Sequence, residues 1–313
     1  MGEHKIKQYN REQYLQHNPF CCYCGAQATT TDHIPSRAYF LRRDWPEGFE
    51  FPACETCNDE TRIDEQVVAF LLNLRLINSS PAIEELLSKL AKAITNNAPE
   101  IMLEWRVNVP TSVSGRKRAF REAFGPLGDE LRREQYGMID IGPLTKQRVS
   151  RFITKLGKTL FYKHIGRILD GYMFQSWHNI YTDPMETLQK RMNNIHNFAK
   201  NIEIPERAKK PTIDQFFYRY NCDPDRGWLF ASVTFSEQMM FDLIVLTEPA
   251  LEWILEQAGQ PETKSEYDFA RERLKFQSRA TGAVFPHTNF PRGVAFPTVR
   301  PGAIQRHSVF KPT

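Results

Sequence analysis

The chain has 313 residues, of which 41% are apolar and 25% are charged, with a formal net charge of +4 and an isoelectric point near 8.7. The length suffices for two domains or one large one, and the apolar fraction supports a real core. No run of about 18 apolar residues occurs, which argues against a transmembrane helix. The mildly basic charge is compatible with nucleic-acid binding but is not diagnostic of it.

Six cysteines occur, and four of them lie in closely spaced pairs, which argues against a disulfide-bonded scaffold. The opening residues, MGEHKIKQYNREQY, lack the apolar core of a signal peptide. We therefore expect a protein of a reducing compartment, located in the cytoplasm and not at a membrane.

After a short lead-in over residues 1–20, the cysteines form two Cys-x-x-Cys pairs, Cys21/Cys24 and Cys54/Cys57. Two such turns bring four thiolates around one ion, so the pattern predicts a structural zinc site. Gly25 suits the first turn because a positive φ is often needed there. Cys22 is expected to be a bystander, although Cys22 with Cys24 is an alternative first pair.

The spacer between the two pairs is long enough for a small hairpin. Residues 29–31 are three threonines, which favour a strand leading into Asp32-His33. Ile34-Pro35 then predicts an extended or turning exit. Arg42 and Arg43 follow in the loop region, near where a phosphate would pass.

From Cys57 the apolar spacing becomes helical, with its repeats at Val67, Val68, Phe70, Leu71, Leu74 and Ile77. Thr56 or Asn58 can cap this helix. The acids Asp59, Asp64 and Glu65 offer further oxygen ligands for an ion, or are ordinary helix-terminal and solvated charges. Residues 82–96 predict a second amphipathic helix, and residues 99–145 are mixed, with a basic run at 115–121.

Residues 145–170 predict a long helix. Its basic residues recur at steps of three, four and three, at Arg148, Arg151, Lys155 and Lys158. This stripe is either a solvated helix face or a face that contacts phosphates.

Further along, residues 185–200 predict a helix, and two apolar runs near 228–246 predict a hairpin of buried strands. Residues 248–258 and 262–276 predict two more helices. The tail over 277–313 contains three Phe-Pro steps and is expected to lack regular structure.

The string C-x-x-C-G, D-H-I-P and P-A-C-x-x-C-N over residues 21 to about 65 resembles the HNH endonuclease family, in its zinc-stapled subgroup. The resemblance implies an N-terminal ββα-metal, treble-clef-like module. The expected fold class is therefore α+β: this module over residues 1–78, a mostly helical targeting or regulatory domain with the hairpin over 79–276, and the tail.

By the same resemblance, His33 is the general base that takes a proton from water, a task suited to its ordinary pKa near 6.5. Asp32 and Asn58 are the implied ligands of a catalytic Mg²⁺ or Mn²⁺, which prefers oxygen donors. The ion would neutralise the scissile phosphate and stabilise the leaving 3′ oxygen. The expected substrate is DNA, with RNA as the alternative.

One position departs from the family pattern, because the middle Asn is missing between residues 34 and 53, where Glu47 or Glu50 stands nearby. A non-catalytic zinc module that binds nucleic acid or protein is therefore the alternative function. Family-level analogy further suggests anti-phage defence or a mobile element. A homodimer or a regulatory protein partner is compatible with the sequence.

Overall fold

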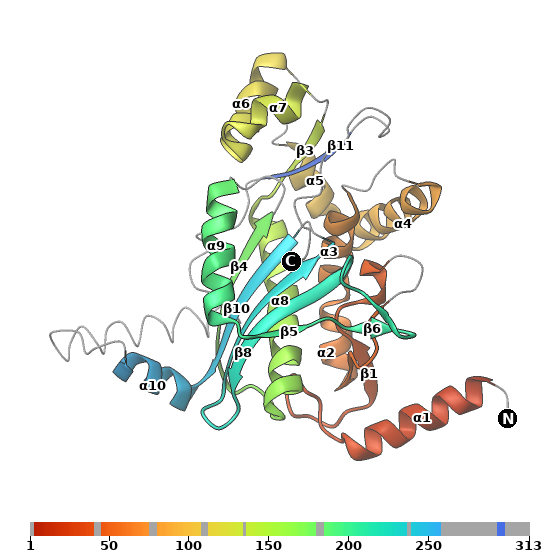
Figure 1. Ribbon diagram of the computed structural model, residues 1–313. Coiled ribbons are helices and arrows are strands. Elements are labelled where there is room, and N and C mark those ends of the chain that lie inside the picture. Colours follow the sequence, from red (N-terminus) through yellow and green to blue (C-terminus); the bar gives the residue numbers. More distant parts are fainter. Residues whose placement is uncertain are drawn as a thin grey trace.

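The computed structural model describes residues 3–40, 45–74, 80–107, 112–133, 136–179, 185–236, 239–257 and 293–297. Within them the protein is α+β, as predicted. A cysteine-containing module is packed against one long helix, which in turn is packed against an antiparallel sheet (Figure 1). The predicted helix over 262–276 and the residues Arg42 and Arg43 lie outside the described residues.

The described residues between 3 and 74 form the cysteine-containing module, with the elements α1 (Glu3–His17), β1 (Thr30–His33), a 3-10 turn η1 (Arg37–Tyr39), β2 (Glu50–Ala53), α2 (Glu55–Glu60) and α3 (Arg62–Leu74). The predicted strand into Asp32-His33 is confirmed as β1. It pairs antiparallel with β2 in a register that places His33 opposite Glu50. Helix α1 was not predicted, since residues 1–20 were expected to be only a lead-in.

The helix predicted after the second cysteine pair is broken into α2 and α3 at Thr61, and its N-cap differs from the prediction. Cys54 has the extended backbone of an N-cap residue, and its sulfur accepts the N–H of Cys57. Neither Thr56 nor Asn58 caps the helix, because both already lie inside α2. The predicted helix over 82–96 is confirmed as α4 (Pro81–Asn97), which Ser80 caps.

The long predicted helix is confirmed as α8 (Pro143–Ile165), and α5 (Pro99–Val107) packs against it. Glu104 of α5 caps its start, accepting the N–H groups of Leu144 at 2.8 Å and Thr145 at 2.9 Å. The helix ends at Gly166, which adopts a left-handed conformation with φ of 76° that glycine accommodates without strain. The middle of α8 is buried on both sides, between α3 and the sheet.

The sheet has five antiparallel strands in the order β4-β10-β9-β8-β5. Their bounds are β4 (Gly171–Asn179), β5 (Asn201–Glu203), β8 (Phe216–Asp223), β9 (Trp228–Phe235) and β10 (Met239–Thr247). The predicted hairpin is confirmed as β9 and β10. Three strands that were not predicted, β4, β5 and β8, extend this hairpin on both sides into the sheet.

Two further helices belong to the sheet region, α9 (Met185–Phe198) and α10 (Glu248–Gln257), and both were predicted. A short hairpin of β6 (Glu206–Arg207) and β7 (Lys210–Pro211) leaves the sheet toward the cysteine-containing module. In Figure 1, β6 lies near β1 and α2.

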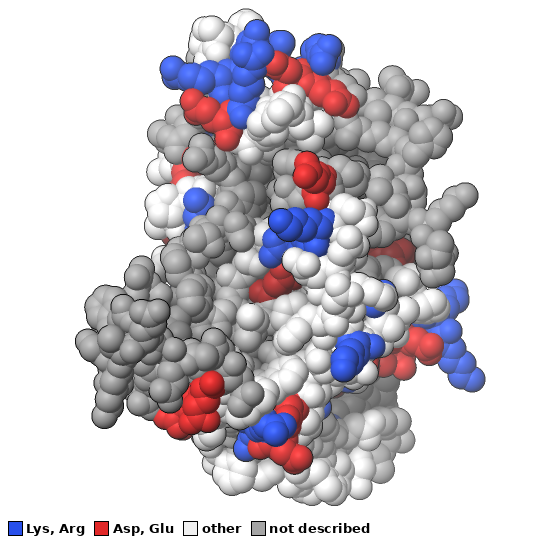
Figure 2. Space-filling model, turned by 60° about the vertical axis from the view of Figure 1, so that its left-hand side comes forward, with Lys and Arg blue, Asp and Glu red and all other residues white. Residues whose placement is uncertain are grey.

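A small separate cluster is formed by α6 (Val113–Phe124), α7 (Leu127–Arg133) and β3 (Tyr136–Asp140) around Phe120 and Phe124. Figure 2 shows Lys and Arg gathered at this end of the molecule, with Asp and Glu among them. The strand β11 (Gly293–Pro297) pairs with β3, so this part of the tail has regular structure, contrary to the prediction.

One hydrophobic core joins both sides of the predicted domain boundary at residue 78. It includes Phe49 and Val68 from the first region, and Phe152, Phe216 and Phe241 from the second. Among the described helices, none combines the length and the apolarity that crossing a bilayer requires.

Candidate metal centre and neighbouring charged residues

The first cysteine turn is shaped by backbone hydrogen bonds. Cys21 donates its N–H to the carbonyl of Ala26 at 2.7 Å, and Gly25 donates to the carbonyl of Cys21 at 2.9 Å. Gly25 has the predicted positive φ, at 76°. This turn faces the end of β2, where Cys54 begins α2.

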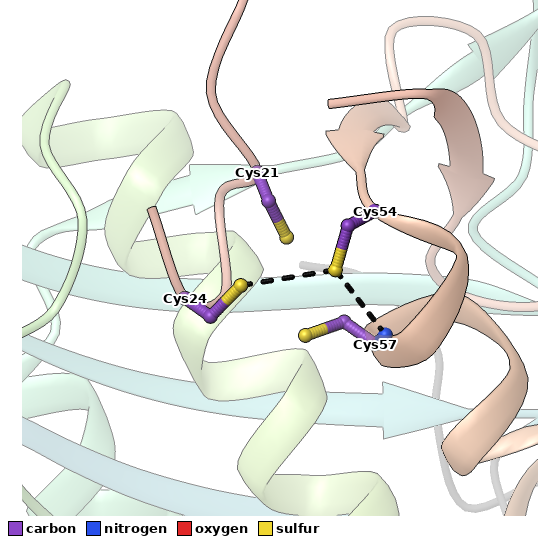
Figure 3. Close-up of side chains that lie close together, drawn as sticks. All are labelled: Cys21, Cys24, Cys54 and Cys57. Carbon is purple, nitrogen blue, oxygen red and sulfur yellow. Dashed lines mark hydrogen bonds between the residues drawn. The ribbon is translucent and has the colours of Figure 1, made fainter. Parts of the chain in front are cut away.

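The side chains of Cys21, Cys24, Cys54 and Cys57 point toward a common centre (Figure 3). Their four sulfurs lie within 4.8 Å of one another, and those of Cys24 and Cys54 are 3.8 Å apart. Tetrahedral zinc with bonds of about 2.3 Å separates its sulfurs by about 3.8 Å. The four thiols therefore fit a metal ion such as zinc.

The surroundings act differently on the members of this cluster, since burial raises the pKa of Cys24 and of Cys57, whereas the pKa of Cys54 is lowered. The N–H of Cys57 lies 3.4 Å from the sulfur of Cys54, and this hydrogen bond lowers the pKa of Cys54, which favours the thiolate that a metal requires. Cys22 is fully buried beside the cluster and is not part of it. The predicted pairing through Cys21 is thus the one that the structure assembles.

Asp32 and His33 face opposite sides of β1, because successive side chains of a strand alternate. Asp32 is 5% exposed. Its Oδ2 accepts the hydroxyl of Tyr23 at 2.9 Å and lies 2.6 Å from Nζ of Lys155. The ammonium already neutralises the carboxylate and would repel a second cation, so Asp32 in this arrangement does not fit a divalent ion.

Lys155 lies between two carboxylates, at 2.6 Å from Asp32 and 2.7 Å from Glu65. Burial acts to lower the pKa of Lys155, but Glu65 and Asp32 outweigh this effect and raise it. Burial raises the pKa of Glu65 to about 7, against the opposing effect of Lys155. One ammonium balances the charge of only one of the two buried carboxylates, which favours a bound proton on the other acid, here Glu65.

The rest of the predicted basic stripe also faces the cysteine-containing module. Arg148 pairs with the fully buried Asp64 at 3.0 Å, and Arg151 pairs with the same carboxylate at 3.0 Å. Lys158 lies 3.5 Å from the carbonyl of Tyr23.

These contacts change the interpretation of the stripe. Lys155 is 4% exposed and cannot reach a phosphate at the surface, so its predicted phosphate contact is wrong. The corresponding role of Arg148, Arg151 and Lys158 stays a prediction, although the acids of α2 and α3 already engage both arginines.

His33 lies at the end of β1 with 19% of its side chain exposed. Its Nε2 is 2.8 Å from the carboxylate of Glu50, its cross-strand partner, and Nη2 of Arg37 contacts the same nitrogen. The hydrogen bond from His33 lowers the pKa of Glu50, and the charge of Arg37 lowers it further. Glu50 thus stays ionised and holds the imidazole.

Asn58 lies in α2, partly buried, and its backbone N–H donates to the carbonyl of Cys54 at 3.1 Å. Within the described part of the chain, no hydrogen bond or ion pair joins its side chain to Asp32 or His33. The structure therefore places the three predicted catalytic residues in three different environments.

Sequence reasoning did not assign roles to Arg37, Trp45 or Arg207, and it named Glu50 only as one acid near the missing Asn. The guanidiniums of Arg37 and Arg207 each lie 4.6 Å from the centre of the Trp45 ring. The pairing of β1 with β2 could have indicated Glu50, because a strand of four residues on each side puts it opposite His33. No local signal marks Arg207.

Comparisons with protein-family models, with curated proteins and with solved structures found no match to this chain. The fold and the site define an α+β protein whose four clustered cysteines can hold a metal ion such as zinc.

Proposed function

We propose that this protein is a zinc-stapled HNH-type endonuclease that hydrolyses phosphodiester bonds of nucleic acid, with DNA as the expected substrate and His33 as the general base. The observation that carries the proposal is the position of His33, which lies partly exposed on the β1–β2 strand pair that leads into the second cysteine pair, with an ionised carboxylate on one ring nitrogen. The order strand, strand, helix around the cysteines supports the same reading.

The chemistry follows from the contacts of the imidazole. When Glu50 accepts the proton on Nε2, Nδ1 carries the free lone pair and can take a proton from water. The carboxylate also stabilises the imidazolium that forms, as an orienting acid does for a catalytic histidine. Arg37 supplies positive charge beside the ring, where a phosphodiester would lie. The four cysteines would hold a zinc ion that fixes the first cysteine turn against β2 and α2, so the role of this ion would be structural.

A nuclease assay on matched variants tests the proposal. Plasmid DNA, single-stranded DNA and RNA are each incubated with wild type, His33→Ala and His17→Ala, with Mg²⁺, with Mn²⁺ and without added divalent ion. His17 is the control because it is a histidine on the exposed surface of α1.

Loss of the base should reduce cleavage by about 100-fold or more in His33→Ala, while His17→Ala should match wild type. Zinc content measured on each sample confirms that the module is intact. Equal cleavage by wild type and His33→Ala, or no cleavage of any substrate by wild type, would refute a nuclease with His33 as its base.

A second candidate function, a non-catalytic zinc module that binds nucleic acid, is favoured by the contacts of Asp32. Its carboxylate is buried and bonded to Tyr23 and Lys155, so it does not fit the ion that the resemblance implies. This candidate predicts binding without cleavage, and binding that survives His33→Ala.

A further inference from the structure

The turn between β6 and β7 places two consecutive residues in the left-handed region, Ala208 with φ of 50° and Lys209 with φ of 66°. Such two-residue hairpin turns favour Asn and Gly, because a side chain at positive φ costs about 1 kcal/mol. Lys209 therefore occupies a position where glycine would be the less strained choice. The turn holds the Lys209 side chain at an exposed tip, where its charge is open to a ligand.

This hairpin is fastened to the segment that precedes β2. Glu47 donates its N–H to the carbonyl of Glu206 at 2.9 Å, and its carboxylate accepts the N–H of Ala208 at 3.1 Å. These contacts fix the tip of the hairpin beside the β1–β2 pair, consistent with the position of β6 in Figure 1.

Two guanidiniums lie between the hairpin tip and His33. Arg207 and Arg37 both contact the face of Trp45, with their side chains 36% and 52% exposed. An aromatic face holds a guanidinium in place while leaving its N–H edge available to an anion. Arg37 also contacts His33, so the contacts run from Arg207 through Trp45 and Arg37 to the proposed base.

Acids are present on this surface, but most are engaged. Glu47 bonds the hairpin and pairs with Arg207 at 3.8 Å, and Glu50 bonds His33 and pairs with Arg37 at 3.7 Å. Glu206 is exposed beside them. Lys209 and Lys210 are exposed, and neither has an acidic partner among the described residues. The uncompensated positive charge therefore lies at the hairpin tip.

Two other basic surfaces are weaker candidates for contact with a phosphate backbone. The stripe on α8 pairs with the acids of α2 and α3, as described above. On α6, Arg118 and Arg121 pair with Glu122 and Asp129, and Figure 2 shows acidic side chains among the basic ones there, although Arg116 and Lys117 are exposed. Figure 1 also places α6 and α7 at the opposite end of the molecule from β1.

We propose that the β6–β7 hairpin, with Arg207, Lys209 and Lys210, together with Arg37, binds the phosphate backbone of a nucleic acid and leads it past His33. The inference rests on the proposed function for the identity of the anion. It assigns the contact with substrate to a hairpin of the sheet region, so the two regions of the chain form one surface.

Binding of fluorescein-labelled DNA, as a duplex and as a single strand, is measured across a series of salt concentrations. The variants are Lys209→Gly, the double variant Lys209→Gly with Lys210→Gln, and the control Lys117→Ala on the exposed face of α6. Lys209→Gly is informative because glycine adopts the positive φ freely, so the fold should keep its thermal stability while one charge is lost.

Each lost phosphate contact should reduce the slope of log affinity against log salt by about 0.9, or about 0.7 for a single strand. We expect about one such step for Lys209→Gly, about two for the double variant and none for Lys117→Ala. Unchanged slopes for both hairpin variants, or a larger effect of Lys117→Ala, would overturn the inference. Absence of binding by wild type would overturn it as well.

The outcome separates this inference from the proposed function. If His33→Ala abolishes cleavage while the hairpin variants bind normally, the nuclease proposal stands and the hairpin surface is rejected. If wild type binds but never cleaves, and the hairpin variants lose their salt dependence, the surface stands as that of a binding module.

Discussion

The buried acid Glu65 makes stability depend on pH, and replacing it with glutamine should remove that dependence. The carboxylate of Glu65 pairs with the ammonium of Lys155, which also pairs with Asp32 of β1. It accepts a hydrogen bond from the hydroxyl of Thr61 at 3.4 Å. Burial raises its pKa to about 7 from an ordinary value of 4.5. The folded protein therefore binds a proton that the unfolded chain releases between these two values.

The sign and the size follow from linkage. Because the folded-state pKa is raised, the stabilisation by this proton is complete below pH 4.5 and is lost as the pH rises to about 7. At about 1.4 kcal/mol for each pH unit, the loss amounts to about 3 kcal/mol. The amide introduced by Glu65→Gln would resemble the protonated acid, accept the same hydrogen bond from Lys155, and leave Asp32 to balance the ammonium.

Urea unfolding of wild type and Glu65→Gln from about pH 5 to about pH 8 measures this directly. The difference in the free energy of unfolding should be small at the acid end and should favour the variant by up to about 3 kcal/mol at the alkaline end. Glu85→Gln, at an exposed ion pair with Lys89, is the control and should show no such divergence. A variant less stable than wild type at pH 8, or a difference independent of pH, would refute the reasoning.

Two further predictions concern the cysteine cluster and the start of α8. Elemental analysis should find one zinc ion per chain in wild type and in Cys222→Ser, whose cysteine lies away from the cluster. Cys57→Ser should lose the zinc and with it the cooperative unfolding of residues 21–74. Zinc retained by Cys57→Ser would exclude the four-sulfur site. Glu104→Gln should lower the free energy of unfolding by about 1–2 kcal/mol, because its carboxylate accepts two N–H groups at the positive end of α8. A stability equal to wild type in urea unfolding would show that this cap contributes little.

Much of the fold was predictable because its signals are local. The helices over 82–96 and 185–200 were recognisable from apolar residues at helical spacing, and the β9–β10 hairpin from two apolar runs with a short break. The strands β4 and β8 were missed because they join the sheet through partners far along the chain. β8 carries buried residues at only Phe216 and Tyr218, and this pattern is too short to separate from a loop.

The sequence by itself determined the cysteine cluster, because the spacing within each Cys-x-x-Cys turn and the glycine after the first pair specify the local backbone. It also placed His33 at the end of a strand. Only the tertiary structure decided which charged groups pair. Helix α8 packs beside the β1–β2 pair and brings Lys155 to Asp32, and the register of β1 with β2 brings Glu50 to His33. The β6–β7 hairpin, distant in the sequence, brings Arg207 to Trp45. The sequence does not indicate the partner of a charged residue, because ion pairing depends on the distance and the burial that packing creates.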